Sequence, residues 1–440
     1  MKKKIFLVAL VLGLLITACG GSSPTNPPVA DNGESGEKVT LRVWSYQNPA
    51  WNKANQDLMD KFMAENPNIE IKYETFDYDT FIQNLQTSMT AGTEADVIEI
   101  FGTWACSYAK GGRLLPVPAD IMTYEQAKEM FFDAPLSGYY CDGSLYGLPN
   151  EFNLENGGAL VNLDLFKENG VKYPPEWNTW SDLVRDAQAM TKFENGTMTK
   201  AGFHFTNGDG VAFTFMAGIL QAGGSYFDTD GKHFTFDTPE ARQIAQLMVD
   251  MAQKDKIIDP ILFNDEAGPI QTTFFTGNVG IGFIGSYAAA EGLANYPDIN
   301  LDYAALPPYF GDKQLFAADS GWGKVVSKNT KHPAEAWKLA QYMTTNPDEA
   351  LQFAIKSTTI PAIKSIVENP DKLLEGAPFL KSILPILPNG KYIGDLTDRD
   401  QLFYEILYPN LLEAMQGNIT VDEAVIKINT EANAMVDAKK

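Results

Sequence analysis

Apolar positions between residues 39 and 101 alternate between the period of a strand and that of a helix. "VTLRVWSY", Val39 to Tyr46, alternates as a half-buried strand does, and residues 54–67 carry Leu58, Met59, Phe62 and Met63 on one helical face. A strand-like run at 68–76, a helix-like run at 79–92 and an apolar run at 95–101 follow. Strand, helix, strand, helix and strand in this order predict an α/β fold with a parallel sheet covered by helices.

A second series of α/β elements begins near residue 156. Residues 156–166 are strand-like, and helix patterns follow at 178–192 and 237–255, the latter with Thr238 as cap and Pro239 as first helical residue. A strand pattern at 316–328, helices over 332–354 and an amphipathic helix at 420–436 complete the chain. The pattern predicts two α/β lobes.

The first 37 residues differ from the rest. Lys2 to Lys4, an apolar run and small residues before Cys19 make residues 1–19 a secretory signal. Ile16 to Cys19 resembles the lipobox of bacterial lipoproteins, in which the cysteine is acylated; the alternative is an ordinary signal with a chance cysteine. Residues 20–37 have almost no apolar side chains and predict a flexible linker. We expect an exported protein, held by lipid at Cys19 to the outer face of the cytoplasmic membrane.

Charge and cysteine content narrow the classes of partner. The 440 residues carry a formal net charge of −22, which argues against binding to nucleic acid or to anionic lipid. Cys106 and Cys141 remain besides Cys19. Outside the cytoplasm they can form a disulfide or stay two separately buried thiols, and the sequence leaves both alternatives open.

Motifs for catalysis and cofactors are nearly absent. Gly280, Gly282 and Gly285 have the spacing of a dinucleotide-binding turn. Export and a position far from the first βαβ unit argue against that interpretation. Three histidines form no pair at metal-ligand spacing, no nucleophile elbow occurs, and no carboxylate pair stands out. We therefore expect no cofactor, no metal and no enzymatic activity.

Aromatic residues beside neutral polar and acidic ones follow several predicted strands. Aromatic rings stack on the apolar faces of sugars, and amides and carboxylates bind the hydroxyl edges. Loops at the carboxyl ends of parallel strands are where such ligands bind. The residues of this pattern are Trp44, Tyr46, Gln47, Phe101, Trp104, Asn150, Glu151, Phe152, Asn153, Tyr287, Asp319 and Trp322.

From about Val39 onward the chain resembles a family 1 extracellular solute-binding protein, the group similar to maltose-binding protein. The matching segments include "SMTAGTEADVIEIFGTWACSYAKGGRLLPV", "GSLYGLPNEFNLENGGALVNLDLF", "FFTGNVGIGFIGSY" and "ADSGWGKVVSK", in order over nearly the whole mature chain. The resemblance implies a two-lobed periplasmic-binding-protein fold of type II with a hinge. Lobe 1 would be residues 38–149 and 309–356, and lobe 2 residues 150–308 and 357–440.

The resemblance also implies a function and a ligand site. The protein would be a monomeric carbohydrate-binding component of an ABC importer, closing around its ligand for the permease. Phe213 joins the residues above as a ligand-binding residue of lobe 2, and Tyr287 stands where the family often has tryptophan. A two-lobe binder of an amino acid, iron or polyamine is the alternative, although no arginine clamp is obvious in the cleft strands. An exported glycoside hydrolase would share the aromatic cleft but show turnover.

Overall fold

The computed structural model describes residues 38–154, 156–205, 207–229, 231–259, 270–283, 285–396 and 398–439. These residues belong to one compact unit, Lys38–Lys440. The predicted signal at 1–19, the lipid site Cys19 and the linker at 20–37 lie outside the described residues. No helix of the described ranges is long and apolar enough to cross a membrane.

The first five-stranded sheet, sheet A, contains the N-terminal strands. Its strand order is β2-β1-β3-β13-β6, with β1 parallel to β2 and β3, and β13 antiparallel to β3 and β6. The strands are β1 (Val39–Tyr46), β2 (Ile69–Phe76), β3 (Val97–Phe101), β6 (Gly147–Pro149) and β13 (Trp322–Val326). The predicted parallel arrangement of the first three strands is confirmed.

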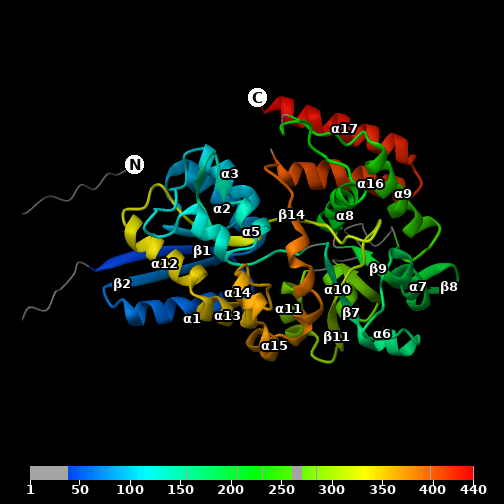
Figure 1. Cartoon of the computed structure of the whole chain (residues 1–440), viewed down its shortest axis with the longest axis horizontal. Coiled ribbons are helices and arrows are strands. Elements are labelled where there is room, and N and C mark those ends of the chain that lie inside the picture. The colour runs from blue at the N-terminus through cyan, green and yellow to red at the C-terminus, as the bar shows by residue number, and fades with distance from the viewer. Residues whose placement is uncertain are drawn as a thin grey trace, which may run out of the picture. The chain divides into compact units, whose positions relative to one another are not determined.

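Helices cover both faces of sheet A (Figure 1). The strand order places β2 and β3 on opposite sides of β1, so right-handed crossovers put α1 and α2 on opposite faces. Asn48 caps α1, and its buried face includes Trp51, Leu58 and Phe62. The helices of this region are α1 (Pro49–Glu65), α2 (Tyr78–Ala91), α3 (Gly102–Lys110), α4 (Tyr124–Met130), α5 (Asp133–Ser137), α12 (Pro333–Thr345) and α13 (Pro347–Ser357).

The second five-stranded sheet, sheet F, has the order β11-β7-β10-β9-β8. Its strands are β7 (Gly158–Asn162), β8 (Lys192–Glu194), β9 (Thr197–Phe205), β10 (Val279–Phe283) and β11 (Leu301–Ala305). The central strand β10 contains the first glycines of the G-x-G-x-x-G spacing. A Cβ at Gly280 would lie 2.7 Å from the Met190 side chain and 3.1 Å from the Gly202 carbonyl oxygen. The glycine therefore permits close packing of β10.

The helices around sheet F include a group formed by α8, α9, α16 and α17, which pack together (Figure 1). Thr420 begins α17 with a capping box that Glu423 completes. The helices are α6 (Leu163–Glu168), α7 (Trp180–Met190), α8 (Asn207–Gln221), α9 (Pro239–Gln253), α10 (Ile270–Phe275), α11 (Tyr287–Asn295), the π-helical stretch η5 (Gln401–Leu407), α16 (Tyr408–Met415) and α17 (Val421–Ala438).

The chain crosses between the two sheets after β6, after β11 and again after α13. β12 (Phe316–Ala318) pairs in parallel with β14 (Gly390–Tyr392) and packs on α8, although it falls within the predicted first lobe. The lobe boundaries stay a prediction. The last crossing contains α14 (Lys364–Glu368), α15 (Asp371–Gly376), η3 (Pro378–Ser382) and η4 (Leu384–Asn389).

A disulfide joins Cys106 of α3 to Cys141 of β4 (Tyr140–Cys141), which pairs with β5 (Ser144–Leu145). Both cysteines are buried. Of the two alternatives that the sequence leaves open, the structure has the disulfide. It ties the helix that follows β3 to the hairpin that precedes β6.

Candidate functional site

Four aromatic side chains meet at one edge of sheet A, and we call them the aromatic wall: Tyr46, Phe101, Trp104 and Trp322. Tyr46 stacks on Trp322 with ring centroids 4.5 Å apart, and Phe101 and Trp104 lie 4.2 and 5.7 Å from Trp322. Tyr46 and Phe101 end the parallel strands β1 and β3. Trp322 begins the antiparallel β13 and pairs with Phe101 in register, so all three reach the same edge. The structure thus brings together four of the predicted site residues.

The turn before β13 fixes the position of Trp322. Ser320 and Gly321 have φ angles of 59° and 119°, and a Cβ at Gly321 would lie 2.6 Å from the Glu151 carbonyl oxygen. The Glu151 side chain accepts a 3.2 Å hydrogen bond from the Trp322 amide. Tyr139 donates a 2.9 Å hydrogen bond to the Gly321 carbonyl. Hydrogen bonds to its backbone therefore hold the "DSGWG" segment in place. Position 321 requires glycine, because its φ angle is positive and a Cβ there would clash.

Two exposed tyrosines accompany the wall. Tyr78, at the start of α2, is 40% exposed and lies 6.3 Å from Tyr46 and 6.5 Å from Trp104 between ring centroids. Tyr404 of η5 is 44% exposed. Desolvation nevertheless raises the pKa of both hydroxyl groups. Both hydroxyl groups therefore keep their protons, although each side chain reaches the surface.

A buried arginine connects the wall to the elements around sheet F. The Arg399 side chain is 5% exposed and donates to Asp319 at 2.7 Å, to Asp209 at 2.9 Å and to Asp400 at 3.2 Å. Its Nη2 also lies 2.6 Å from the Asp319 carboxylate as an ion pair. Its guanidinium carbon lies 5.8 Å from the Phe101 ring and 4.5 Å from the Phe403 ring. Phe101 belongs to sheet A, whereas Asp209 and Phe403 belong to α8 and η5. We call Arg399 and its three carboxylates the arginine cluster.

The electrostatics of the arginine cluster follow from burial. Burial raises the pKa of Asp319 to about 6, against the opposing effect of Arg399. Burial also raises the pKa of Asp400 above its ordinary value. For Arg399 burial disfavours the charge, but Asp209 and Asp319 outweigh it and raise its pKa well above its ordinary value. The guanidinium is therefore a permanent cation, and each of its three nitrogens already donates to a protein carboxylate.

A pocket of about 340 Å³ adjoins the wall and the cluster. We call this pocket, together with the exposed surface of the wall and the cluster beside it, the crevice. The sides of the pocket are α2, α3 and the segment that carries Arg399. Its lining residues are Ile82, Leu85, Gln86, Thr103, Trp104, Ser107, Tyr108, Leu396, Asp398, Arg399, Asp400 and Lys439. Aromatic, hydroxyl, amide and charged groups of this kind can stack on and hydrogen-bond a polyhydroxylated ligand.

The remaining predicted residues of sheet A have other surroundings. Trp44 is buried, packs edge-on against Phe76 at 5.3 Å and donates a hydrogen bond to Glu74. It lies toward β2 instead of joining the wall. The Gln47 side chain is exposed just after β1.

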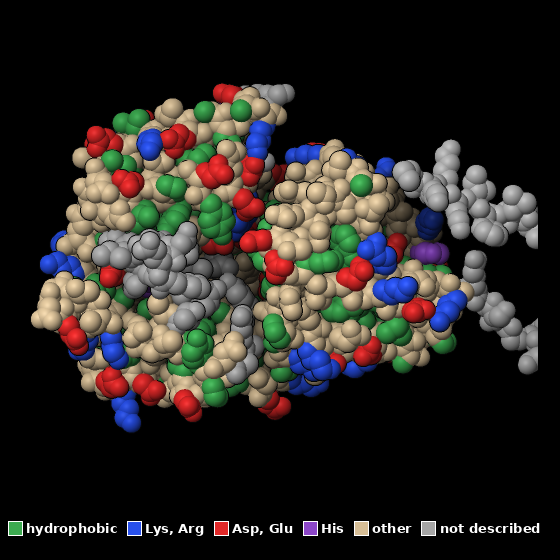
Figure 2. All heavy atoms as spheres, turned by 180° about the vertical axis from the view of Figure 1, so that it is seen from behind, with side chains coloured by type: hydrophobic (Ala, Val, Ile, Leu, Met, Phe, Trp, Pro, Cys, Tyr) green, Lys and Arg blue, Asp and Glu red, His purple; other side chains and the backbone are tan. Residues whose placement is uncertain are grey.

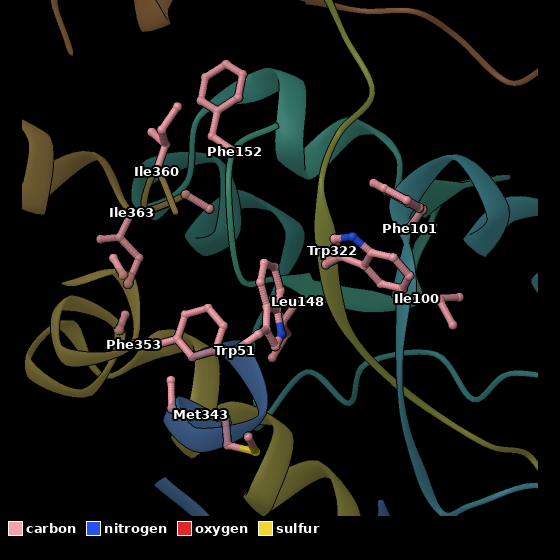
Figure 3. Packing of buried hydrophobic residues seen from close by; sticks show 14 of the residues in the cluster. Trp51, Ile100, Phe101, Leu148, Phe152, Trp322, Met343, Phe353, Ile360 and Ile363 are labelled. Atoms are coloured by element: carbon pink, nitrogen blue, oxygen red, sulfur yellow. The ribbon is translucent and has the colours of Figure 1, made fainter. Parts of the chain in front are cut away.

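Phe152 does not line an accessible surface. It is 1% exposed and packs against Phe132 and Phe316, and Figure 3 shows it beside Ile360, apart from Trp322 and Phe101. In this structure Phe152 is a core residue, and its prediction as a ligand contact stays a prediction. Its neighbours Glu151 and Asn153 are buried beside the "DSGWG" turn, where the Asn153 amide donates to the Ser320 carbonyl at 3.4 Å.

Phe213 and Asp319 belong to the floor of the site. Phe213 is 0% exposed, meets Phe403 edge-on at 5.2 Å and lies 5.8 Å from the Arg399 guanidinium carbon. Asp319 is 0% exposed and binds Arg399. In this structure both residues contact Arg399, and the prediction of Phe213 as a ligand-binding residue stays a prediction. Tyr287 begins α11, and its side chain lies outside the described residues.

Sequence reasoning missed Arg399, Asp209, Tyr78 and Tyr404. Tyr78 follows the carboxyl end of β2, so the strand-end rule that selected Tyr46 and Phe101 could have found it. Arg399 and Tyr404 lie outside any predicted strand end. The expectation that the cleft strands offer no obvious arginine clamp did not cover Arg399, which lies between β14 and η5 and pairs with protein carboxylates.

Comparison with known proteins identifies the family. The model of the bacterial extracellular solute-binding protein family matches residues 47–350. A Brucella abortus (strain 2308) protein described as a binding protein is 26% identical over 401 residues, covering 88% of this chain and 90% of its own. The maltotriose-binding protein of Pyrococcus abyssi is 24% identical, with 75% of this chain and 68% of its own covered.

The fold is also similar to solved structures. An ABC transporter solute-binding protein from Thermotoga lettingae, bound with α-D-tagatose, superposes with a TM-score of 0.75 at 20% identity, covering 90% of this chain and all of that one. The predicted two-lobed α/β fold is thereby confirmed. The chain belongs to the bacterial extracellular solute-binding protein family.

Proposed function

We propose that this protein captures a carbohydrate in the crevice lined by the aromatic wall, Tyr78 and Tyr404, and delivers it to the membrane permease of an ABC importer. The observation that carries the proposal is the aromatic wall itself, in which Tyr46 and Trp104 remain partly exposed while Phe101 and Trp322 support them. Partly exposed rings can stack on the C–H face of a sugar. The tyrosine hydroxyls and the carboxylates of Asp209 and Asp400 supply hydrogen-bonding groups for its edges.

The identities of relatives support the choice of carbohydrate. One relative is named for binding maltotriose, and one structural neighbour contains α-D-tagatose. These ligands differ in length, so the proposal covers mono- and oligosaccharides alike. As proposed from the sequence, Gln47, Glu151 and Asn153 remain further candidate contacts near the crevice.

Closure of two lobes is the proposed mechanism. Lobe 1 would contain sheet A and lobe 2 sheet F, with hinges in the connections after β6, β11 and α13. A ligand shifts an open-closed equilibrium only by its preference for the closed form, and a change from 1:99 to 99:1 needs about 5.5 kcal/mol. Several stacked rings and hydrogen bonds, each contributing about 0.5 to 1.5 kcal/mol, are enough. Acylation at Cys19 would hold the protein at the outer face of the cytoplasmic membrane, near its permease. We expect it to act there as a monomer.

Thermal unfolding in the presence of a ligand panel tests the proposal. Residues 38–440, which form one compact unit, are heated with mono- and oligosaccharides, amino acids and polyamines. A ligand at 100 times its dissociation constant stabilises the folded state by about 2.7 kcal/mol. We expect a selective upward shift of the midpoint with one group of sugars, and complete recovery of the unchanged sugar.

Each alternative has its own result in this experiment. A shift with amino acids or polyamines alone would refute the carbohydrate assignment and leave the family membership intact. Consumption of the sugar would indicate a glycoside hydrolase. Replacing Tyr46 by Ala should reduce the sugar shift, while Tyr173→Ala, which alters a tyrosine 36% exposed elsewhere, serves as the matched control.

A further inference from the structure

The charges of the crevice are unequal, and this inequality restricts what it can bind. One guanidinium, Arg399, faces three carboxylates, those of Asp209, Asp319 and Asp400. The only other cation in the pocket lining among the described residues is Lys439, and it binds Asp398. Four carboxylates thus stand against two cations, all of them paired; Asp398 and Asp400 line the pocket itself, and Asp209 and Asp319 pair with Arg399 beside it.

The accessible part of the arginine cluster is its negative part. The side chains of Asp400 and Asp209 are 46% and 27% exposed, whereas those of Arg399 and Asp319 are 5% and 0% exposed. A ligand that enters the crevice therefore meets carboxylate oxygens before it meets the guanidinium. Figure 2 shows, on the face seen from behind, acidic side chains gathered along the furrow that divides the surface.

The cluster also engages all three nitrogens of Arg399, since one N–H of each donates to a protein carboxylate. A carboxylate ligand is bound tightly when an arginine presents two unoccupied N–H groups to it. Here Nε of Arg399 donates to Asp319, Nη1 donates to Asp400, and Nη2 donates to Asp209 while lying 2.6 Å from the same Asp319 carboxylate. An anion bound to Arg399 would stand beside these carboxylates in a partly desolvated site and would be repelled by them.

Neutral ligands do not meet this obstacle. The hydroxyls of Tyr78 and Tyr404 stay protonated, and Asp209 and Asp400 accept hydrogen bonds from sugar hydroxyls. An ammonium group would find carboxylates with remaining lone pairs.

We propose that the crevice selects saccharides without negative charge, neutral sugars and amino sugars, and rejects uronic acids, sialic acids and sugar phosphates. This selectivity rests on the proposed carbohydrate function of the same site. It assigns Asp209 and Asp400 as specificity-determining residues, because they are the exposed carboxylates of the cluster.

The test compares sugars of equal size and different charge on the full chain, purified in detergent. Each neutral sugar that raises the unfolding midpoint is measured by calorimetry beside its C6-carboxylate and its C6-amide; for glucose these are glucuronate and glucuronamide. Glucosamine, galacturonate, N-acetylneuraminate and glucose 6-phosphate complete the series. We expect the carboxylate to bind at least tenfold more weakly than the neutral sugar, and the amide to bind within threefold of it.

Variants connect the selectivity to the named residues. In Asp209→Asn/Asp400→Asn the ratio of neutral to carboxylate affinity should fall at least threefold. Asp60→Asn/Asp120→Asn, which removes two exposed charges outside the arginine cluster, should leave the ratio unchanged and controls for total charge.

Every outcome decides between the two proposals. Equal or tighter binding of carboxylates, or a shift with acidic sugars alone, overturns the charge selectivity and leaves the carbohydrate function standing. Rejection of the amide as strongly as the carboxylate shows a steric origin and overturns it as well. The same holds if the double variant keeps the wild-type ratio. Absence of binding by every saccharide refutes the carbohydrate function and this selectivity together.

Discussion

The aromatic wall of sheet A and the aromatic core around sheet F both consist of rings in contact, but they differ in exposure to solvent. Trp322 and Phe101 lie 4.2 Å apart in the wall, and Phe203 and Phe205 lie 5.2 Å apart beside β9. Phe203 and Phe205 are 0% exposed, whereas Tyr46 and Trp104 of the wall are partly exposed. Aromatic content alone therefore does not locate a ligand site. The location follows from rings that stop at a sheet edge beside polar groups.

Removal of a core ring should have the largest effect on stability. Phe203→Ala should lower the free energy of unfolding by about 3 to 5 kcal/mol, because a fully buried ring leaves a cavity. Urea denaturation followed by fluorescence measures the change. Phe193→Ala, at a ring 49% exposed on the neighbouring β8, should cost less than about 1 kcal/mol. Similar losses in both variants would contradict the distinction between core and surface rings.

The disulfide should stabilise the side of the molecule that carries the wall. Cys106 and Cys141 are 35 residues apart in sequence, and closing a loop of that length contributes about 3 to 4 kcal/mol in the chain-entropy model. The double variant Cys106→Ser/Cys141→Ser should lose that amount in urea denaturation. Reduced wild-type protein should unfold at the same urea concentration as the double variant. A loss below about 1 kcal/mol would show that the bond is not a main support of α3.

Removal of a wall ring should affect binding more than folding. For a sugar that binds the wild type, Trp104→Ala should weaken the affinity by a factor of about 2 to 13, since one aromatic contact contributes about 0.5 to 1.5 kcal/mol. Calorimetric titration measures the affinity. The matched control is Trp177→Ala. Trp177 is also partly exposed, but it does not belong to the wall, and its indole donates a hydrogen bond to Asp186. Equal effects of the two variants would argue against the wall as the binding surface.

The smallest expected effect is at the start of α17. Thr420 accepts a 3.2 Å hydrogen bond from the Glu423 amide, and Thr420→Ala should cost about 1 kcal/mol of stability. Thr420→Ser should restore most of it, because serine keeps the hydroxyl. Thermal unfolding distinguishes the two variants. A loss of sugar affinity in Thr420→Ala would show that the helix cap and the crevice are coupled, contrary to the comparison above.

Local patterns predicted the fold well and the site only in part. The strand Val39–Tyr46 is observed with the predicted bounds, because alternation of apolar residues depends on neighbours in sequence. Phe152 shows the limit of the same reasoning: in extended backbone, successive side chains point to opposite sides, so a neighbour of the buried Glu151 can face the core. An error of one position exchanges a site residue for a core residue.

The arginine cluster could not be predicted from local patterns. Asp209, Asp319 and Arg399 come from three distant parts of the chain and meet only after folding. Nothing in the sequence around Arg399 differs from a surface segment with alternating charges. Its burial among Phe101, Phe213 and Phe403 is a property of the tertiary structure.

Lys439 offers a means of observing the crevice by fluorescence. Its side chain lines the 340 Å³ pocket and is 40% exposed. A cysteine introduced there can be coupled to an environment-sensitive dye, because Cys106 and Cys141 are buried and joined to each other. Entry of a ligand would displace water around the dye and change its emission. The protein thereby becomes a reagentless optical sensor for whatever solute it takes up.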